Sequence, residues 1–127
     1  MINGNGDMPD WDNEHDMPWY DFADDITIIT VNNGITAIGA SAFANCYNVE
    51  EVNLPESVKR LNEEAFFETG VFEEFTISSN IVYVGSCVFS DCENLKRIYV
   101  EHSEEFVVAN WHEYWVGEID PEIIYTK

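Results

Sequence analysis

The sequence repeats itself with a period of 23 residues. Three segments align without insertion: "ITIITVNNGITAIGASAFANCYN" from Ile26, "VEEVNLPESVKRLNEEAFFETG" from Val49 and "FEEFTISSNIVYVGSCVFSDCEN" from Phe72. The aligned apolar residues form seven columns: Ile26/Val49/Phe72, Ile29/Val52/Phe75, Val31/Leu54/Ile77, Ile35/Val58/Ile81, Ile38/Leu61/Val84, Ala42/Ala65/Val88 and Phe43/Phe66/Phe89. A fourth copy starts with Leu95, Ile98 and Val100, and the pattern then stops. Such a period indicates a solenoid in which each repeat forms one coil.

Each repeat predicts a short strand with alternate residues inward, then a second short extended piece, and then a single helical turn at "E-E-A-F". One coil buries too little apolar surface to fold alone, so the array needs stacked neighbours and a cap at each end. We expect one domain in three parts: an N-terminal cap over 1–25, repeats over 26–101 and a C-terminal cap over 102–127. Aromatic residues in the caps are interpreted as plugs for the open coils, with a carbohydrate or other ligand platform as the alternative.

The charge of the chain is strongly negative, with 5 Lys and Arg against 25 Asp and Glu and a net charge of −20. Such a surface repels phosphate backbones and anionic lipid, so nucleic acid and bare membrane are poor partners. A hydrophobic content of 46% predicts a folded chain. No apolar run of about 18 residues occurs, so no segment is expected to insert into a membrane.

The repeat resembles a known family. The stretches "ITAIGASAFANC", "VEEVNLPESVKRLNEEAF" and "IVYVGSCVFSDCENLKRIYV" are similar to the BspA-like leucine-rich repeats of bacterial surface proteins. Departures occur in the second repeat, where Asn62 replaces glycine and Thr69 replaces cysteine, and the family's proline is present only as Pro55. The resemblance implies a right-handed leucine-rich-repeat solenoid.

The resemblance also has implications for function. It implies an extracellular or cell-surface protein that adheres to, or otherwise binds, a host or bacterial surface protein or glycoprotein, without catalysis or a cofactor. The stretch "MINGNGDMPDW" lacks the features of a signal peptide, which leaves a cytosolic protein or a trimmed chain as alternatives. The resemblance implies the second, a mature or excised part of an exported protein. The alternative function is a structural spacer or capping domain with no ligand site of its own.

The cysteines and histidines are the candidate reactive side chains. Cys46 and Cys92 share one repeat position two coils apart, a distance of roughly 10 Å at strand spacing, so a disulfide is not expected. Thr69 lies between them in the same column, which predicts a small side chain that hydrogen-bonds the turn. Cys87 belongs to a different column. The three histidines, His15, His102 and His112, lie in the caps without a nucleophile motif, so we expect no enzyme.

A weak calcium candidate lies in "DWDNEHDMPWYD". Its acidic residues occupy positions 1, 3, 5, 7 and 12 of an EF-hand-like spacing, and they are Asp10, Asp12, Glu14, Asp16 and Asp21. His15 stands where the loop needs glycine and Pro18 interrupts it, so an acidic solvated loop is the alternative.

The outward positions of the predicted strands are the candidate partner-binding site. They form the columns Ile28/Glu51/Glu74/Arg97 and Thr30/Asn53/Thr76/Tyr99. We expect a regular ribbon, negative in the middle and basic and aromatic at the end with Lys96. The site residues are therefore Glu51, Asn53, Glu74, Thr76, Arg97 and Tyr99, with an ordinary solvated sheet face as the alternative.

Overall fold

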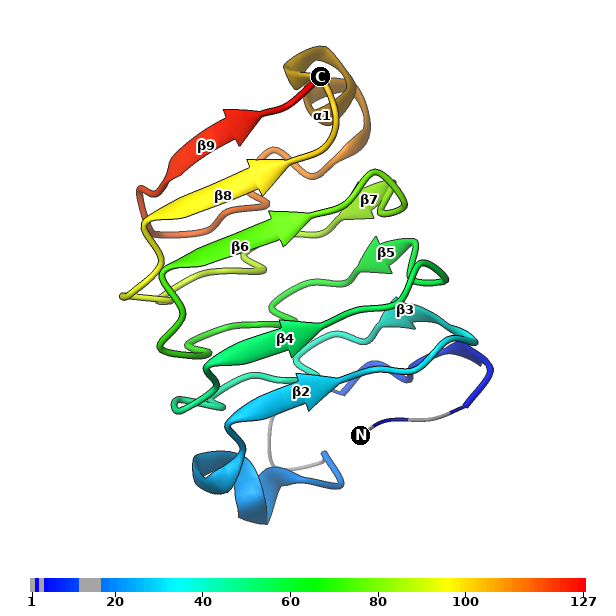
Figure 1. Ribbon diagram of the computed structural model, residues 1–127, viewed down its shortest axis with the longest axis vertical. Coiled ribbons are helices and arrows are strands. Elements are labelled where there is room, and N and C mark those ends of the chain that lie inside the picture. Colours follow the sequence, from blue (N-terminus) through cyan, green and yellow to red (C-terminus); the bar gives the residue numbers. More distant parts are fainter. Residues whose placement is uncertain (1, 3, 12–16) are drawn as a thin grey trace.

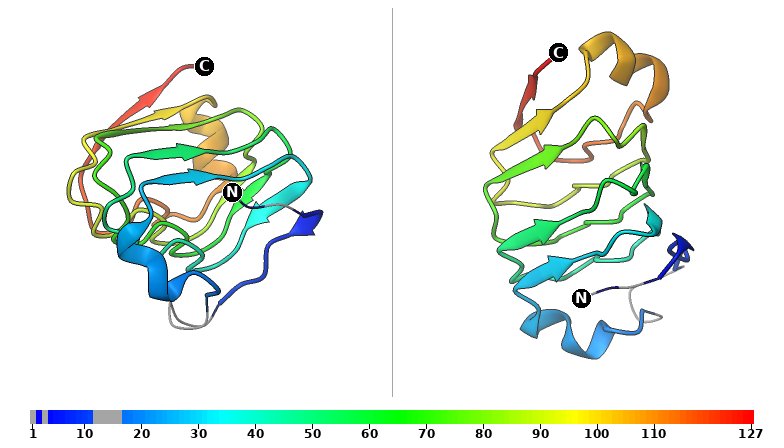
Figure 2. Two further views of the ribbon diagram at one scale, coloured as in Figure 1. Left: turned by 60° about the horizontal axis from the view of Figure 1, so that its bottom comes forward. Right: turned by 45° about the vertical axis from the view of Figure 1, so that its right-hand side comes forward.

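The computed structural model describes residues 2, 4–11 and 17–127. Successive coils stack along one axis, with a 3-10 helix at one end and an α-helix at the other (Figures 1 and 2). The elements in chain order are β1 (Gly6–Asp7), η2 (Tyr20–Asp25), β2 (Ile28–Thr30), β3 (Ile35–Ile38), β4 (Glu51–Asn53), β5 (Arg60–Leu61), β6 (Glu74–Ile77), β7 (Tyr83–Val84), β8 (Arg97–Val100), α1 (Glu104–Asn110) and β9 (Glu122–Tyr125). In this described part, no helix is long and apolar enough to cross a membrane.

Parallel strands line two sides of the solenoid. The back sheet has the order β1-β3-β5-β7, and its register pairs Ala37 with Arg60 and Arg60 with Tyr83. The front side carries β2, β4, β6, β8 and β9, which we call the front strands. Paired residues of neighbouring repeats occupy the same position in each repeat, as in Ile28↔Glu51 and Glu74↔Arg97. The predicted solenoid with one strand per coil and a second extended side is therefore confirmed.

Stacked phenylalanine rings fill the centre of the core. Phe43, Phe66 and Phe89 are at most 1% exposed, and consecutive ring centroids lie 5.6 Å and 6.0 Å apart. Trp19 continues the stack at the N-terminal end, 5.3 Å from Phe43, and Trp115 contacts Phe89 edge-on at 6.4 Å at the other end. Cap aromatics therefore cover the open coils, as predicted.

The caps also carry backbone structure that the sequence pattern did not predict. Strand β1 pairs with β3, and β9 pairs with β8, so each cap extends a sheet by one strand. The fourth coil continues beyond the point where the repeat pattern stops: α1 takes the place of a back strand. The turn at 114–116 then accepts hydrogen bonds from the backbone N–H groups of Cys87, Val88 and Phe89.

The residues of the column Ser41/Glu64/Cys87 share one backbone conformation. All three residues have positive φ, between 55° and 59°, and Asn45, Glu68 and Asp91 further along each turn have φ between 51° and 63°. The two positions recur in each of these coils because the chain needs two left-handed residues to turn between its sides. Cys87 thus occupies a turn position.

Gly39 is required for close packing against the N-terminal cap. A Cβ atom at Gly39 would lie 1.7 Å from the carbonyl oxygen of Pro9. Gly39→Ala is expected to force the segment around Pro9 off the back sheet, with a loss of about 1–3 kcal/mol in the free energy of unfolding. Hydrogen exchange checks this, because the amides of Met8 and Trp11 donate to Ala37 and Ala40 and should lose protection. Unchanged protection at both amides would contradict the expected displacement.

Candidate binding face

The outward residues of the front strands form the two predicted columns only in part. Ile28 lies beside Glu51, and Glu74 beside Arg97. The front strands, however, divide into a two-stranded sheet, β2-β4, and a three-stranded sheet, β6-β8-β9. The continuous ribbon expected from the sequence is therefore wrong at one place, between β4 and β6, where Figure 1 shows a wider interval than between the strands on either side.

Two bulky side chains account for this division. Phe72 and Phe75 occupy columns that hold Val49 and Val52 in the preceding coil. The Phe75 ring lies 5.4 Å from Phe66 and 5.0 Å from Phe89, so it fills space between two coils of the core. The larger rings keep the start of β6 away from β4.

The turn before β6 also differs from its neighbours. Asn48 and Asn94 donate side-chain hydrogen bonds to the carbonyls of Asp24 and Gly70 in the preceding coil, at 2.8 and 3.5 Å. Val71 occupies the same column and has no donor in its side chain; its backbone N–H instead bonds to the Val49 carbonyl. The backbone N–H of Glu50 donates to the Thr27 carbonyl, and that of Lys96 donates to the Glu73 carbonyl. Within the described residues, no equivalent backbone hydrogen bond joins Glu73 to Glu50. The chain thus enters β6 by a different path.

A groove of about 450 Å³ lies between β4 and β6. Its apolar floor is formed by Val52, Leu54, Phe72, Phe75 and Ile81, and its acidic rim by Glu50, Glu51 and Glu74. A pocket of this size, with an apolar floor and a few polar groups, falls within the range of ligand sites. The repeat pattern predicted Glu51, Asn53, Glu74 and Thr76 on this surface, but not the groove or its floor.

Charged groups at the β6–β8 side are paired with one another. Arg97 Nε donates to Glu74 Oε2 at 2.7 Å, and Lys96 Nζ lies 3.0 Å from Glu73 Oε1. The Tyr99 hydroxyl donates to the same Glu74 oxygen at 3.2 Å. The Arg97 hydrogen bond, more than the one from Tyr99, holds the pKa of Glu74 below its ordinary value. The expected basic end is therefore neutralised by acidic neighbours.

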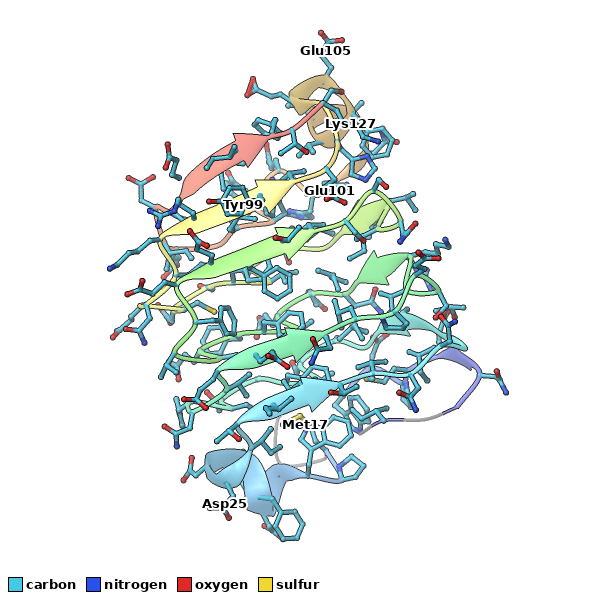
Figure 3. The ribbon with its side chains drawn as sticks, viewed as in Figure 1. Met17, Asp25, Tyr99, Glu101, Glu105 and Lys127 are labelled. Carbon is cyan, nitrogen blue, oxygen red and sulfur yellow. The ribbon has the colours of Figure 1, made fainter. Side chains whose placement is uncertain are left out.

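The face extends further than the sequence columns indicated. Strand β9 pairs Glu122 with Arg97 and Ile124 with Tyr99, which adds a fifth row beyond β8. These partners lie further apart in the sequence than one repeat, so a search at the repeat period misses them. Figure 3 shows Tyr99 over β8 on the side that faces the viewer.

The calcium candidate is tested only in part. Asp12, Glu14 and Asp16 lie outside the described residues, while Asp21 lies in η2. Asp10 Oδ1 accepts hydrogen bonds from the Ala40 amide at 2.6 Å and the Asn62 side chain at 2.8 Å, so this oxygen joins the cap to the coils. Among the residues that the structure describes, no group of three His, Cys, Asp or Glu residues could hold a metal ion.

The Cys46/Thr69/Cys92 column has the structural role expected for it. Thr69 Oγ1 donates to the Phe43 carbonyl, and Cys92 Sγ donates to the equivalent Phe66 carbonyl at 3.0 Å. Both cysteines are buried and free. His102 also serves packing: it stacks on Phe106 at 4.2 Å and its Nε2 lies 2.7 Å from the Ile81 carbonyl oxygen. His112 is exposed, and its Nδ1 accepts a hydrogen bond from the Tyr114 amide.

Thiol reactivity is expected to follow burial. Burial raises the pKa of Cys46 to about 12 and that of Cys92 to about 11, so neither forms thiolate near pH 8. Burial, followed by nearby glutamates, also raises the pKa of Cys87, but this residue is partly exposed. With Ellman's reagent near pH 8, Cys87 should react slowly and the other two only after denaturation. A Cys87→Ser variant should show no native reaction; rapid native labelling of Cys46 or Cys92 would contradict their burial.

The repeats of this chain match those of a known family. Residues 19–110 match the family model described as BspA type leucine rich repeat region, with 6 copies. The match covers more than half of the chain, so the protein belongs to the BspA-type leucine-rich-repeat family. Its members are repeat modules for protein interaction or structural support.

Two solved structures resemble this chain. A leucine rich cell surface protein from Faecalibacterium prausnitzii A2-165 is 30% identical over 58% of this chain and 19% of its own, with a TM-score of 0.55. A leucine-rich repeat protein from Eubacterium ventriosum ATCC 27560 is 22% identical over 78% of this chain and 38% of its own, with a TM-score of 0.61. The chain thus spans well under half of either protein. A search of curated proteins finds no match.

Proposed function

We propose that the chain is a non-enzymatic protein-interaction module of a bacterial cell-surface protein, and that its front strands are the adhesive face. The observation that carries the proposal is the groove in this face, which joins an apolar floor to outward polar columns. Support for the location comes from the F. prausnitzii protein, which is a cell surface protein. The partner is a host or bacterial surface protein or glycoprotein.

The proposal is tested by a matched pair of tyrosine substitutions. Tyr99 lies half-buried on front strand β8, and Tyr83 lies exposed on back strand β7. The purified chain is passed over immobilised host matrix proteins and mucins in a surface plasmon resonance panel. For any partner that binds, Tyr99→Ala should weaken binding by roughly tenfold or more, and Tyr83→Ala should not. Equal effects of the two variants would overturn the assignment of the face.

The alternative function is a structural spacer of a larger surface protein. It is favoured by the small share of each solved relative that the chain covers. Absence of binding to every member of the panel, with both variants folded, would support this alternative.

A further inference from the structure

We propose that the groove between β4 and β6 binds an extended, basic peptide segment of a protein partner as an added β-strand. This inference rests on the proposed function and names the chemistry of the partner that the front face recognises. Three observations carry it: the orientation of the backbone groups on both sides of the groove, the apolar floor and the charge of the rim.

The first observation is a pair of strand edges that face each other without pairing. On β4, Glu51 N–H donates to Thr27 and the Asn53 carbonyl accepts from Val31, so both residues use their backbone groups toward β2. Because these groups alternate along a strand, the N–H and C=O of Val52 point toward the groove.

The same alternation applies to β6. The Glu73 carbonyl accepts from Arg97, and the Ile77 carbonyl accepts from Glu101, so odd-numbered residues face β8. The backbone groups of Glu74 and Thr76 therefore face the groove. Between residues 51 and 77, all of which are described, no backbone hydrogen bond joins β4 to β6. Such edges are templates for an added strand.

The second and third observations define the side chains of the partner. An added strand directs alternate residues to opposite faces, so one set lies over the floor of Val52, Leu54 and Phe72 and is apolar. The other set lies on the outside, between Glu51 of β4 and Glu74 of β6. Glu74 is already paired with Arg97, whereas Glu50 and Glu51 make no ion pair with any described residue, and the whole chain carries a net charge of −20. Lysine or arginine is therefore the complement on the outer positions.

Synthetic peptides of about eight residues test the proposal by fluorescence anisotropy. A peptide of alternating valine and lysine should bind, and its glutamate counterpart should not. A third peptide keeps the valine and lysine side chains but carries N-methyl groups on alternate backbone nitrogens, which remove the donors that a strand needs. This peptide should lose binding as well. Failure of the valine–lysine peptide to bind at millimolar concentration, or equal binding of the N-methylated form, would overturn the proposal.

Protein variants locate the site. Glu50→Gln/Glu51→Gln should weaken binding of the valine–lysine peptide by roughly tenfold. Glu93→Gln/Glu113→Gln removes the same charge from exposed positions outside the groove and should leave binding unchanged. Bound peptide should also slow hydrogen exchange at Val52 and Thr76. Equal weakening by both variants would indicate attraction to the net charge alone and would overturn the groove as the site.

Different results would contradict the front face as the interaction site and the groove as the site of strand addition. If no peptide binds but a surface protein binds in a Tyr99-dependent manner, the front face remains the interaction site and strand addition is wrong. If the valine–lysine peptide binds and protects Val52, while Tyr99→Ala leaves protein binding intact, the groove stands and the wider face does not.

Discussion

Replacing Phe66 by alanine is expected to lower the free energy of unfolding by about 3–5 kcal/mol. Phe66 is fully buried in the middle coil, and its ring contacts those of Phe43, Phe75 and Phe89. The free energy of unfolding of a native domain is about 5–15 kcal/mol in total, so this one change removes a large part of the stability. Urea titration monitored by circular dichroism measures it.

Phe22→Ala is the control for this prediction. Phe22 is 61% exposed in η2, so its removal should change stability by no more than about 0.5 kcal/mol. A loss below about 1 kcal/mol for Phe66→Ala would contradict the view that the aromatic stack holds the coils together.

Replacing Trp115 by alanine is expected to lower the free energy of unfolding by about 3–5 kcal/mol. The coils at the C-terminal end should be destabilised most. Trp115 is 7% exposed and covers the last ring of the stack, Phe89, while Trp111 packs against it at 5.1 Å. In a solenoid each coil is stabilised by its neighbours, so the loss of a cap exposes the next coil first.

Tyr114→Ala is the matched control, because Tyr114 is adjacent in sequence and 65% exposed. Hydrogen exchange should show faster opening around Phe89 in the Trp115 variant and no change in the Tyr114 variant. Uniform loss of protection from β2 to β8 in the Trp115 variant would show instead that the array unfolds as a single unit.

The repeat period was sufficient to predict the coils, their register and most of the core. Seven columns place a residue such as Leu61 inside because an apolar position repeated in every coil must face the same interior. The occurrence of Thr69 in a column with Cys46 and Cys92 likewise indicated a side-chain hydrogen bond to the turn, which the structure confirms for Thr69 and Cys92. The added strands β1 and β9 could not be predicted in this way, because each cap strand pairs only with one neighbour and does not follow the repeat.

The groove was missed for a different physical reason. A uniform repeat predicts uniform strand pairing between consecutive coils. Pairing also requires that the side chains of each coil allow the next strand to approach within hydrogen-bonding distance. The signals were present in the second turn: Val71 replaces an asparagine found in both neighbouring coils, and Phe72 and Phe75 replace smaller aliphatic residues. Departures from a repeat therefore indicate where this solenoid differs from a uniform scaffold.

The negative charge of the chain bears directly on the groove between β4 and β6. The basic residues at the start of β8 are already paired, as Arg97 is with Glu74. Glu50 and Glu51 make no ion pair with a described residue and lie beside unpaired backbone groups; the Glu51 carboxylate accepts only a neutral hydrogen bond, from the Asn53 side chain at 2.8 Å. A partner would thus meet hydrogen-bonding groups, apolar surface and negative charge within one groove.

The interruption of the front sheet between β4 and β6 predicts a distinct pattern of residue-resolved hydrogen exchange in the free protein. The amides of Val52, Glu74 and Thr76 should exchange rapidly, because they face the groove without a backbone partner. Those of Asn53, Phe75 and Tyr99 lie in paired ladders and should be protected. Protection of Val52 and Thr76 equal to that of Asn53 and Phe75 would mean that the front sheet is continuous and that β4 and β6 are paired.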